Sequence, residues 1–249
     1  MNKTKEVSSF EERLAETLRR TEVVGEAELD RIKVVECKEP LVKLTDYCDV
    51  VISMSQPRLN FELESGRGNE LYARRTVAKM LLEAEASLPD GYRFVVFDAF
   101  RPVDYQARRF KERFEKFAKE FPDKSEQEIR EITFTYIFPP SADPLKASPH
   151  STGGAIDLTI SYKGKPLDMG TEYANYDKNR DLILTNSKLV SAAQRDNRIF
   201  FVKTMLGVGF ANYPGEWWHF MYGDREWVAY DHLADHAIYG GTDFSNVSK

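Results

Sequence analysis

The stretch Ser148-Pro149-His150-Ser151-Thr152-Gly153-Gly154-Ala155-Ile156-Asp157 decides how this chain is interpreted. Residues 155–161 alternate in polarity, which predicts a β-strand whose apolar face packs inward and leaves Asp157 in a polar cleft. The two glycines allow a sharp turn that brings His150 toward Asp157. A neutral imidazole and a carboxylate suit Zn²⁺. A histidine capped by a nearby aspartate in a turn is an equally good interpretation of the spacing.

A second motif, Glu216-Trp217-Trp218-His219-Phe220, carries the next histidine. In one regular strand, a spacing of three puts Glu216 and His219 on opposite faces. Both reach one site only if Glu216 lies in the turn after Pro214-Gly215 and His219 lies on the strand. A carboxylate that reaches a metal site without ligating is what the base of a metallohydrolase requires. The alternative is an aromatic core strand with a hydrogen-bonded histidine and an exposed glutamate.

Together the two motifs offer His150, Asp157 and His219 as ligands. Three protein ligands leave a fourth position for water, which is the pattern of a catalytic zinc site. A structural zinc site normally uses four ligands and is rich in cysteine, but Cys37 and Cys48 lie far from both motifs in the sequence. With no C-x-x-C pair, these cysteines are predicted to be two buried free thiols in a reduced compartment.

Arg101, in Phe97-Asp98-Ala99-Phe100-Arg101-Pro102, follows a predicted strand. A fixed guanidinium there can hold a developing oxyanion, and the alternative is a structural ion pair with Asp98. His232 and His236 are spaced i, i+4 on a short predicted helix, but the H-E-x-x-H form is absent because position 233 is Leu. A nucleophilic triad of Ser148, His150 and Asp157 is disfavoured, since all three are crowded into one loop with no nucleophile elbow.

The rest of the chain interleaves helices and strands and predicts one α+β domain with a small antiparallel sheet flanked by helices. Residues 1–30 are predicted as an N-terminal helical extension, a detachable arm, and residues 31–249 as the main domain. The phenylalanines that repeat between Phe110 and Phe121 are predicted to pack in the core. Helices are expected over 10–30, 73–88, 103–121, 187–207 and from Ser125; strands are expected over 32–35, 50–53, 92–100 and 155–161, with a hairpin turn at Lys163-Gly164.

Composition excludes several classes of protein. The 249 residues include 35 Lys+Arg and 40 Asp+Glu, a net charge of −5, with no basic block, so nucleic acid is not an expected partner. No run approaches the about 18 apolar residues of a membrane helix, so no membrane partner is expected. The charged N-terminus has no secretory signal, which predicts a cytoplasmic protein.

At these residues the chain resembles the D-alanyl-D-alanine dipeptidases of the VanX type, among the zinc D,D-peptidases that share a fold with the hedgehog signalling domain. The resemblance covers residues 30–230. It is carried by Ser148-x-His150-x6-Asp157, Glu216-Trp217-Trp218-His219 and Phe97-Asp98-Ala99-Phe100-Arg101-Pro102, and more weakly by Glu39-Pro40-Leu41-Val42 and Asp168-Met169-Gly170-Thr171.

The resemblance implies the hedgehog/D,D-peptidase fold and one Zn²⁺ ion held by His150, Asp157 and His219. It implies that Glu216 is the general base and that Arg101 polarises the scissile carbonyl and steadies the tetrahedral intermediate. The implied reaction is hydrolysis of the D-Ala-D-Ala dipeptide, a small cell-wall-related substrate, to two D-alanines.

The resemblance also implies that Ser148 and Met169 lie beside the substrate. The family usually reads Met-Gly-x-x-Phe-Asp, and that Asp helps bind the free ammonium of the dipeptide. Here Ala174 stands in its place and cannot bind a cation. Glu172 and Asp177 are the candidate replacements.

Two other functions stay open at this stage. The altered segment 169–174 favours a zinc D,D- or L,D-carboxypeptidase that acts on longer cell-wall peptides. A non-enzymatic, zinc-holding binding module on the same fold is the other alternative, and the presence of both Glu216 and Arg101 argues against it. The sequence leaves open whether the protein forms a homo-oligomer.

Overall fold

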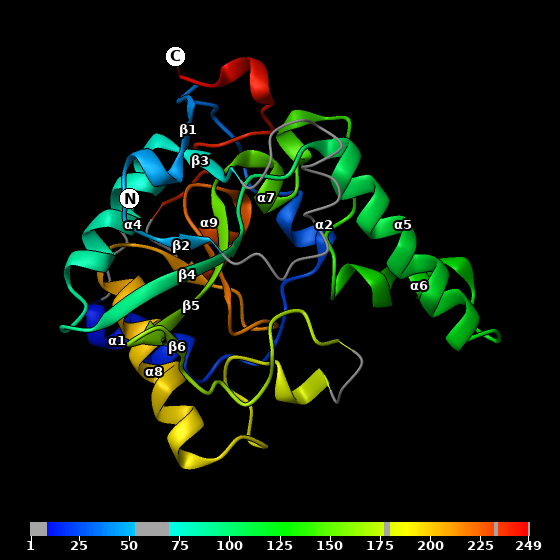
Figure 1. Cartoon of the computed structure of the whole chain (residues 1–249). Helices are drawn as coiled ribbons and strands as arrows, with labels where there is room; N and C mark the ends of the chain where they lie inside the picture. The colour runs from blue at the N-terminus through cyan, green and yellow to red at the C-terminus, as the bar shows by residue number, and fades with distance from the viewer. Residues whose placement is uncertain (1–8, 53–69, 177–179, 232–233, 249) are drawn as a thin grey trace, which may run out of the picture.

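A computed structural model describes residues 9–52, 70–176, 180–231 and 234–248 of the chain. It is an α+β fold in which helices flank a twisted sheet (Figure 1). The helices are α1 (Phe10–Thr17), α2 (Glu26–Leu29), α4 (Arg75–Ala86), α5 (Val103–Glu120), α6 (Glu126–Phe134), α7 (Pro149–Thr152), α8 (Ala192–Gly207) and α9 (Arg225–Asp231). The strands are β1 (Leu41–Lys43), β2 (Val51–Ile52), β3 (Tyr72–Arg74), β4 (Tyr92–Asp98), β5 (Ala155–Tyr162), β6 (Lys165–Pro166), β7 (Ala211–Asn212) and β8 (His219–Met221).

The main sheet has the strand order β2-β4-β5-β8-β7, and β6 pairs with the far end of β5 as the predicted hairpin. Most neighbouring strands are antiparallel, as predicted. The pair β2–β4, at the edge of the sheet, is parallel. The strands β1 and β3 form a separate antiparallel pair.

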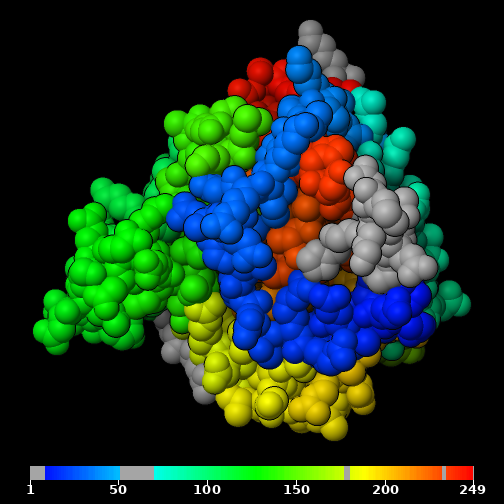
Figure 2. Space-filling view, turned by 180° about the vertical axis from the view of Figure 1, so that it is seen from behind, coloured from blue at the N-terminus to red at the C-terminus, as the bar shows by residue number. Residues whose placement is uncertain are grey.

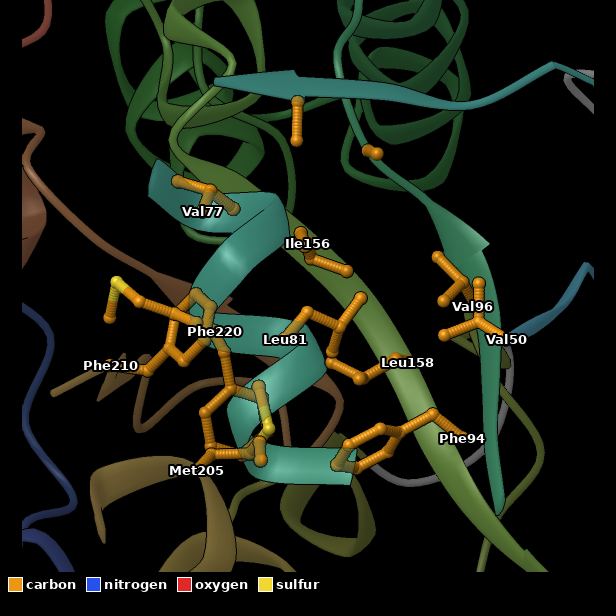
Figure 3. Packing of buried hydrophobic residues seen from close by; sticks show 14 of the residues in the cluster. Val50, Val77, Leu81, Phe94, Val96, Ile156, Leu158, Met205, Phe210 and Phe220 are labelled. Atoms are coloured by element: carbon orange, nitrogen blue, oxygen red, sulfur yellow. The ribbon is translucent and has the colours of Figure 1, made fainter. Parts of the chain in front are cut away.

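The core lies between one face of this sheet and the helices α4 and α8. Ile156 and Leu158 of β5 point to this face (Figure 3), and both are fully buried, as is Ile160. The register pairs Leu158 with Val96 and Ile156 with Phe220, so neighbouring strands present apolar side chains to the same side. The opposite face of β5 therefore carries the polar set that includes Asp157.

Most of the predicted elements are confirmed. The Ser125 hydroxyl accepts a hydrogen bond from the Glu128 backbone N–H, and the Glu128 carboxylate accepts one from Ser125 N–H, so the predicted capping box begins α6. The other confirmed elements are α4, α5, β4 and β5, predicted over 73–88, 103–121, 92–100 and 155–161.

Other boundaries differ from the prediction. The helix predicted over 10–30 is two helices, because the chain leaves the helical conformation after Thr17 and re-enters it only after Gly25. Residues 32–35 form no strand, since Val34 makes a single bridge with Ala237. The helix predicted to begin at residue 187 begins at Ala192, where Ser191 provides the N-cap. The strand predicted over 50–53 is β2, and Ser53 lies outside the described residues.

The phenylalanine repeat of α5 does not enter the main core, contrary to the prediction. The pair α5 and α6 stands apart from α4 and α8, at the other side of the sheet (Figure 1). Phe117 is buried and its ring lies 5.0 Å from that of Tyr136, whereas Phe110, Phe114 and Phe121 are only partly buried. The stripe is covered by α6 and the segment after it, not by the sheet.

The described part of the predicted N-terminal extension packs against the main domain. Figure 2 shows this segment lying across the back of the molecule, beside α8. Phe10, Leu14 and Leu18 pack against the main core. The Arg13 guanidinium donates to both carboxylate oxygens of Asp231 at 2.6 and 2.7 Å, which ties α1 to α9.

Two further predictions concern cysteines and membranes. Both cysteines are free, but only Cys48 is buried; Cys37 is exposed, because it lies in an extended surface segment. None of the described helices is both long enough and apolar enough to cross a membrane.

Candidate active site

The short helix α7 positions His150. Ser148 is its N-cap: the hydroxyl accepts from the Ser151 backbone N–H at 3.3 Å, and Pro149 occupies the first turn. The Nδ1 atom of His150 lies 2.7 Å from the carbonyl oxygen of Ala99. That contact orients the ring, so that Nε2 lies 3.3 Å from Oδ1 of Asp157.

The strand pair β5–β8 brings the other two predicted ligands together. Asp157 and His219 are direct partners in the antiparallel register, and Nδ1 of His219 lies 2.8 Å from Oδ1 of Asp157. One donor atom from each of His150, Asp157 and His219 lies within 4.8 Å of the others, and all three residues are buried. Two imidazole nitrogens and one carboxylate oxygen at such a distance fit a divalent ion such as zinc.

The second oxygen of Asp157 is also held. Oδ2 accepts from the Tyr173 hydroxyl at 2.8 Å and from the Arg101 guanidinium at 3.3 Å. Burial alone would raise the pKa of this carboxyl, but His150 and His219 beside it hold the pKa well below its usual range. Asp157 is therefore an ionised carboxylate whose Oδ1 is directed at both histidines.

Glu216 lies in the turn after Pro214-Gly215, and His219 begins β8, as the sequence predicts for a shared site. The carboxylate is buried, and its Oε1 accepts from the Tyr176 hydroxyl at 2.7 Å. Burial, followed by the negative charge of Asp157, raises the pKa of Glu216 above its usual value. A carboxyl with a raised pKa can both take up and release a proton.

Arg101 makes the structural ion pair that was one of its two interpretations from the sequence. Its Nε donates to Asp98 at 2.8 Å, which is the structural ion pair. One terminal nitrogen reaches Gln106 at 3.2 Å and the other reaches Asp157. The ion pair thus fixes the guanidinium beside the three buried ligand candidates.

Arg101, His150, Glu216 and His219 line one cavity. Asp157 does not line it but contacts Arg101 and both histidines. Ser148 also lines it, in agreement with its predicted place beside the substrate. Met169 does not: its side chain is buried in the main core and borders a separate hollow on the surface. Glu172 borders the same separate hollow, and Asp177 lies outside the described residues.

The predicted histidine pair on a C-terminal helix is not formed as expected. The helix α9 ends at Asp231, residues 234–236 are not helical, and His232 lies outside the described residues. The ring of His236 contacts Asp235 at 2.6 Å on the surface. Neither the helix nor a second metal site is supported here.

Several polar residues in or beside the cavity were not predicted from the sequence. Tyr176, Arg109 and Glu226 line the cavity, and Tyr173 contacts Asp157 from beside it. The carboxylate of Glu226 lies 3.9 Å from Nε2 of His219, and burial together with Asp224 raises its pKa well above the usual value. No local periodicity or spacing marks these residues, because they reach the site only through tertiary packing.

Gly153 and Gly154 of the first motif are each required for a different geometric reason. Gly153 ends α7 with a φ of 75°, in the left-handed region that favours glycine. Gly154 has ordinary φ, but a Cβ there would lie 2.5 Å from the backbone oxygen of Tyr222. Both positions let α7 turn directly into β5, which sets His150 against Asp157.

Comparison with known proteins identifies the family. A profile described as D-Ala-D-Ala dipeptidase matches residues 64–238. The chain belongs to this family and is a peptidase. It is similar to the D-alanyl-D-alanine dipeptidase of Synechocystis sp., at 30% identity over 65% of this chain and 74% of that protein. The dipeptidase of Enterococcus faecalis is 30% identical over 61% of this chain and 73% of its own.

Solved structures of peptidoglycan peptidases are more distant from this family member. The vancomycin resistance D,D-pentapeptidase VanY, in complex with Zn(II), aligns with a TM-score of 0.41 at 16% identity, over 80% of this chain and 92% of its own. The LD-carboxypeptidase LdcB aligns with a TM-score of 0.40 at 20% identity, over 86% of this chain and 80% of its own. At these scores, neither bears on the roles of individual residues here.

The close approach at Gly154 predicts a large effect of a single methyl group. Gly154→Ala should lower the free energy of unfolding by about 1–3 kcal/mol, because the Tyr222 backbone must move to admit the Cβ. Gly207→Ala is the matched control: that glycine ends α8 with nothing within 4 Å of the added Cβ, so little change is expected. Urea unfolding of the two variants and the parent measures the difference. Equal stability of both variants would contradict this account of the turn.

Proposed function

We propose that this protein is a zinc-dependent dipeptidase that hydrolyses D-alanyl-D-alanine to two D-alanines. The observation that carries the proposal is that His150, Asp157 and His219 cluster at one cavity, which Glu216 and Arg101 also line. Membership of the dipeptidase family and the names of its relatives support the choice of substrate.

The proposed zinc ligands are His150, Asp157 and His219. A zinc ion bound to these three side chains supplies Lewis acidity and lowers the pKa of a water in its open position. The contact of His150 Nδ1 with the Ala99 carbonyl fixes the ring that would hold the metal. Because Oδ2 of Asp157 accepts hydrogen bonds from Tyr173 and Arg101, Oδ1 is the oxygen that would bind the metal.

Glu216 is the proposed general base. Its carboxylate takes a proton from the attacking water as the C–O bond forms, and it returns that proton to the leaving amine as the C–N bond breaks. The Tyr176 hydroxyl, at 2.7 Å, keeps the carboxylate in one orientation through both steps. The raised pKa of Glu216 suits a group that must release the proton again.

Arg101 is proposed to stabilise the oxyanion that develops on the scissile carbonyl. Its ion pair with Asp98 and its contact with Gln106 hold the guanidinium before substrate arrives. A donor that is already oriented costs no reorganisation during the reaction. Both Glu216 and Arg101 argue against a binding module that only holds zinc.

A second candidate function is a zinc carboxypeptidase that acts on longer cell-wall peptides. It is favoured by Ala174, which replaces the aspartate expected to bind a free amino group. Glu172, one of the two candidate replacements, borders a different hollow. Only a dipeptidase needs a free amino group on the residue before the cleaved bond.

The release of D-alanine from D-Ala-D-Ala tests the proposed function. Purified protein loaded with zinc is expected to cleave the free dipeptide and to lose the activity in a chelator. N-acetyl-D-Ala-D-Ala is the comparison, because it lacks only the free ammonium. Cleavage of the blocked peptide alone would establish the carboxypeptidase, and zinc binding without cleavage of either would establish the binding module.

Substitution of the proposed base separates catalysis from metal binding. Glu216→Gln should retain one zinc ion and lose at least about a hundredfold in kcat, since general bases contribute about 10²–10⁴-fold. Glu115→Gln, on the exposed face of α5, is the control. Activity equal to that of the parent would remove Glu216 from the mechanism.

Substitution of a proposed ligand should instead remove the metal. His150→Ala is expected to lower the zinc content after dialysis well below one per chain, because two protein ligands hold zinc far less tightly than three. His236→Ala removes a surface histidine and should retain the metal. Metal analysis of both variants decides the point, and unchanged zinc in His150→Ala would exclude it from the ligand set.

A further inference from the structure

Arg109 is a second guanidinium in the active-site cavity. It lies on α5, after Arg101 in the sequence, and lines the cavity together with His150 and Glu216. The residue is partly buried. The proposed hydrolysis assigns no role to Arg109.

The two arginines differ in how their charges are balanced. Arg101 is paired with Asp98 and Asp157. Among the described residues, no carboxylate lies within 4.0 Å of the Arg109 guanidinium. Its carbon lies 5.9 Å from the centre of the Tyr105 ring, and Arg101 is a like charge nearby. Two neighbouring cations repel each other, and an anion placed beside Arg109 would offset that repulsion.

The other charges of the cavity do not provide that anion. The carboxylates that line it are Glu216, which accepts the Tyr176 hydroxyl, and Glu226, which faces His219. Neither is within ion-pair distance of Arg109. The cavity therefore holds one guanidinium that is available to a ligand.

We infer that Arg109 binds a carboxylate of the substrate and so determines which peptides the cavity accepts. The inference rests on the proposed function and extends it. A planar guanidinium matches a carboxylate with two parallel hydrogen bonds. In D-Ala-D-Ala the sole carboxylate is the α-carboxylate at the C-terminus; in other peptides an acidic side chain offers the same chemistry.

The test compares three ligands that differ in where the carboxylate lies. They are D-Ala-D-Ala, its C-terminal amide, and D-Ala-D-Glu α-amide, whose only carboxylate is on the side chain. Dissociation constants are measured by calorimetry with zinc-loaded Glu216→Gln protein, and KM and kcat with the zinc-loaded parent. Each measurement is repeated with Arg109→Met, which keeps the apolar stem, and with Arg109→Lys.

Arg109→Met is expected to weaken binding of D-Ala-D-Ala by about 10- to 100-fold, the loss of a charge-assisted hydrogen bond. Its effect on the C-terminal amide should be less than about twofold, and Arg109→Lys should restore part of the loss. The effect should appear in KM more than in kcat. Lys111→Met, an exposed residue of the same helix, is the control for removing a positive charge. A loss confined to D-Ala-D-Glu α-amide would assign Arg109 to a side-chain carboxylate instead of the C-terminal one.

The outcomes distinguish this inference from the proposed function. If D-Ala-D-Ala is cleaved but Arg109→Met changes neither its preference over the amide nor the binding of D-Ala-D-Glu α-amide, the inference is wrong and the dipeptidase stands. If no D-alanine is released but the carboxylate-bearing ligand binds only when Arg109 is present, the inference stands and the proposed reaction is wrong. Binding of none of the three ligands to the folded, zinc-loaded parent overturns both.

Discussion

The contacts of one buried carboxylate, that of Asp157, constrain the whole site. Its Oδ1 faces both histidines and its Oδ2 is held by Tyr173 and Arg101, so every predicted ligand and one predicted catalytic residue meet at this group. A buried carboxylate stays ionised only with such neighbours. The register of β5 is equally constrained, because a shift of one residue would move Asp157 into the apolar core and bring Ile156 to the cavity.

The sequence predicts this part of the site well because short local patterns determine where these side chains point. Alternation along residues 155–161 fixes which face carries Asp157, and the glycine turn fixes the approach of His150. The spacing of three between Glu216 and His219 requires the turn that is found there. In each case the strand period alone decides the direction of a side chain.

Other features depend on which element packs against which, and a local sequence pattern carries no information about that. The phenylalanine repeat of α5 predicts a helix with one covered face, and the helix is present, but α6 covers that face and the sheet does not. The same limit applies to the cavity: Tyr173 and Tyr176 come from an irregular segment, and Arg109 and Glu226 come from two helices. Their convergence is a property of the tertiary fold.

The site therefore has two parts with different structural origins. Most groups proposed for bond cleavage stand on α7, β5, β8 and the turn after Pro214-Gly215, where register and hydrogen bonding leave little freedom. Arg101 lies between β4 and α5 and is fixed by its ion pair with Asp98. The groups that would select a substrate stand on α5, α9 and the irregular segment before residue 177. A substitution in the second part, such as Ala174 for the expected aspartate, leaves the strand register of the first part unchanged. The two parts touch where Tyr173 and Tyr176 hold Asp157 and Glu216. An intact set of cleavage groups therefore does not by itself decide between a free dipeptide and a longer peptide.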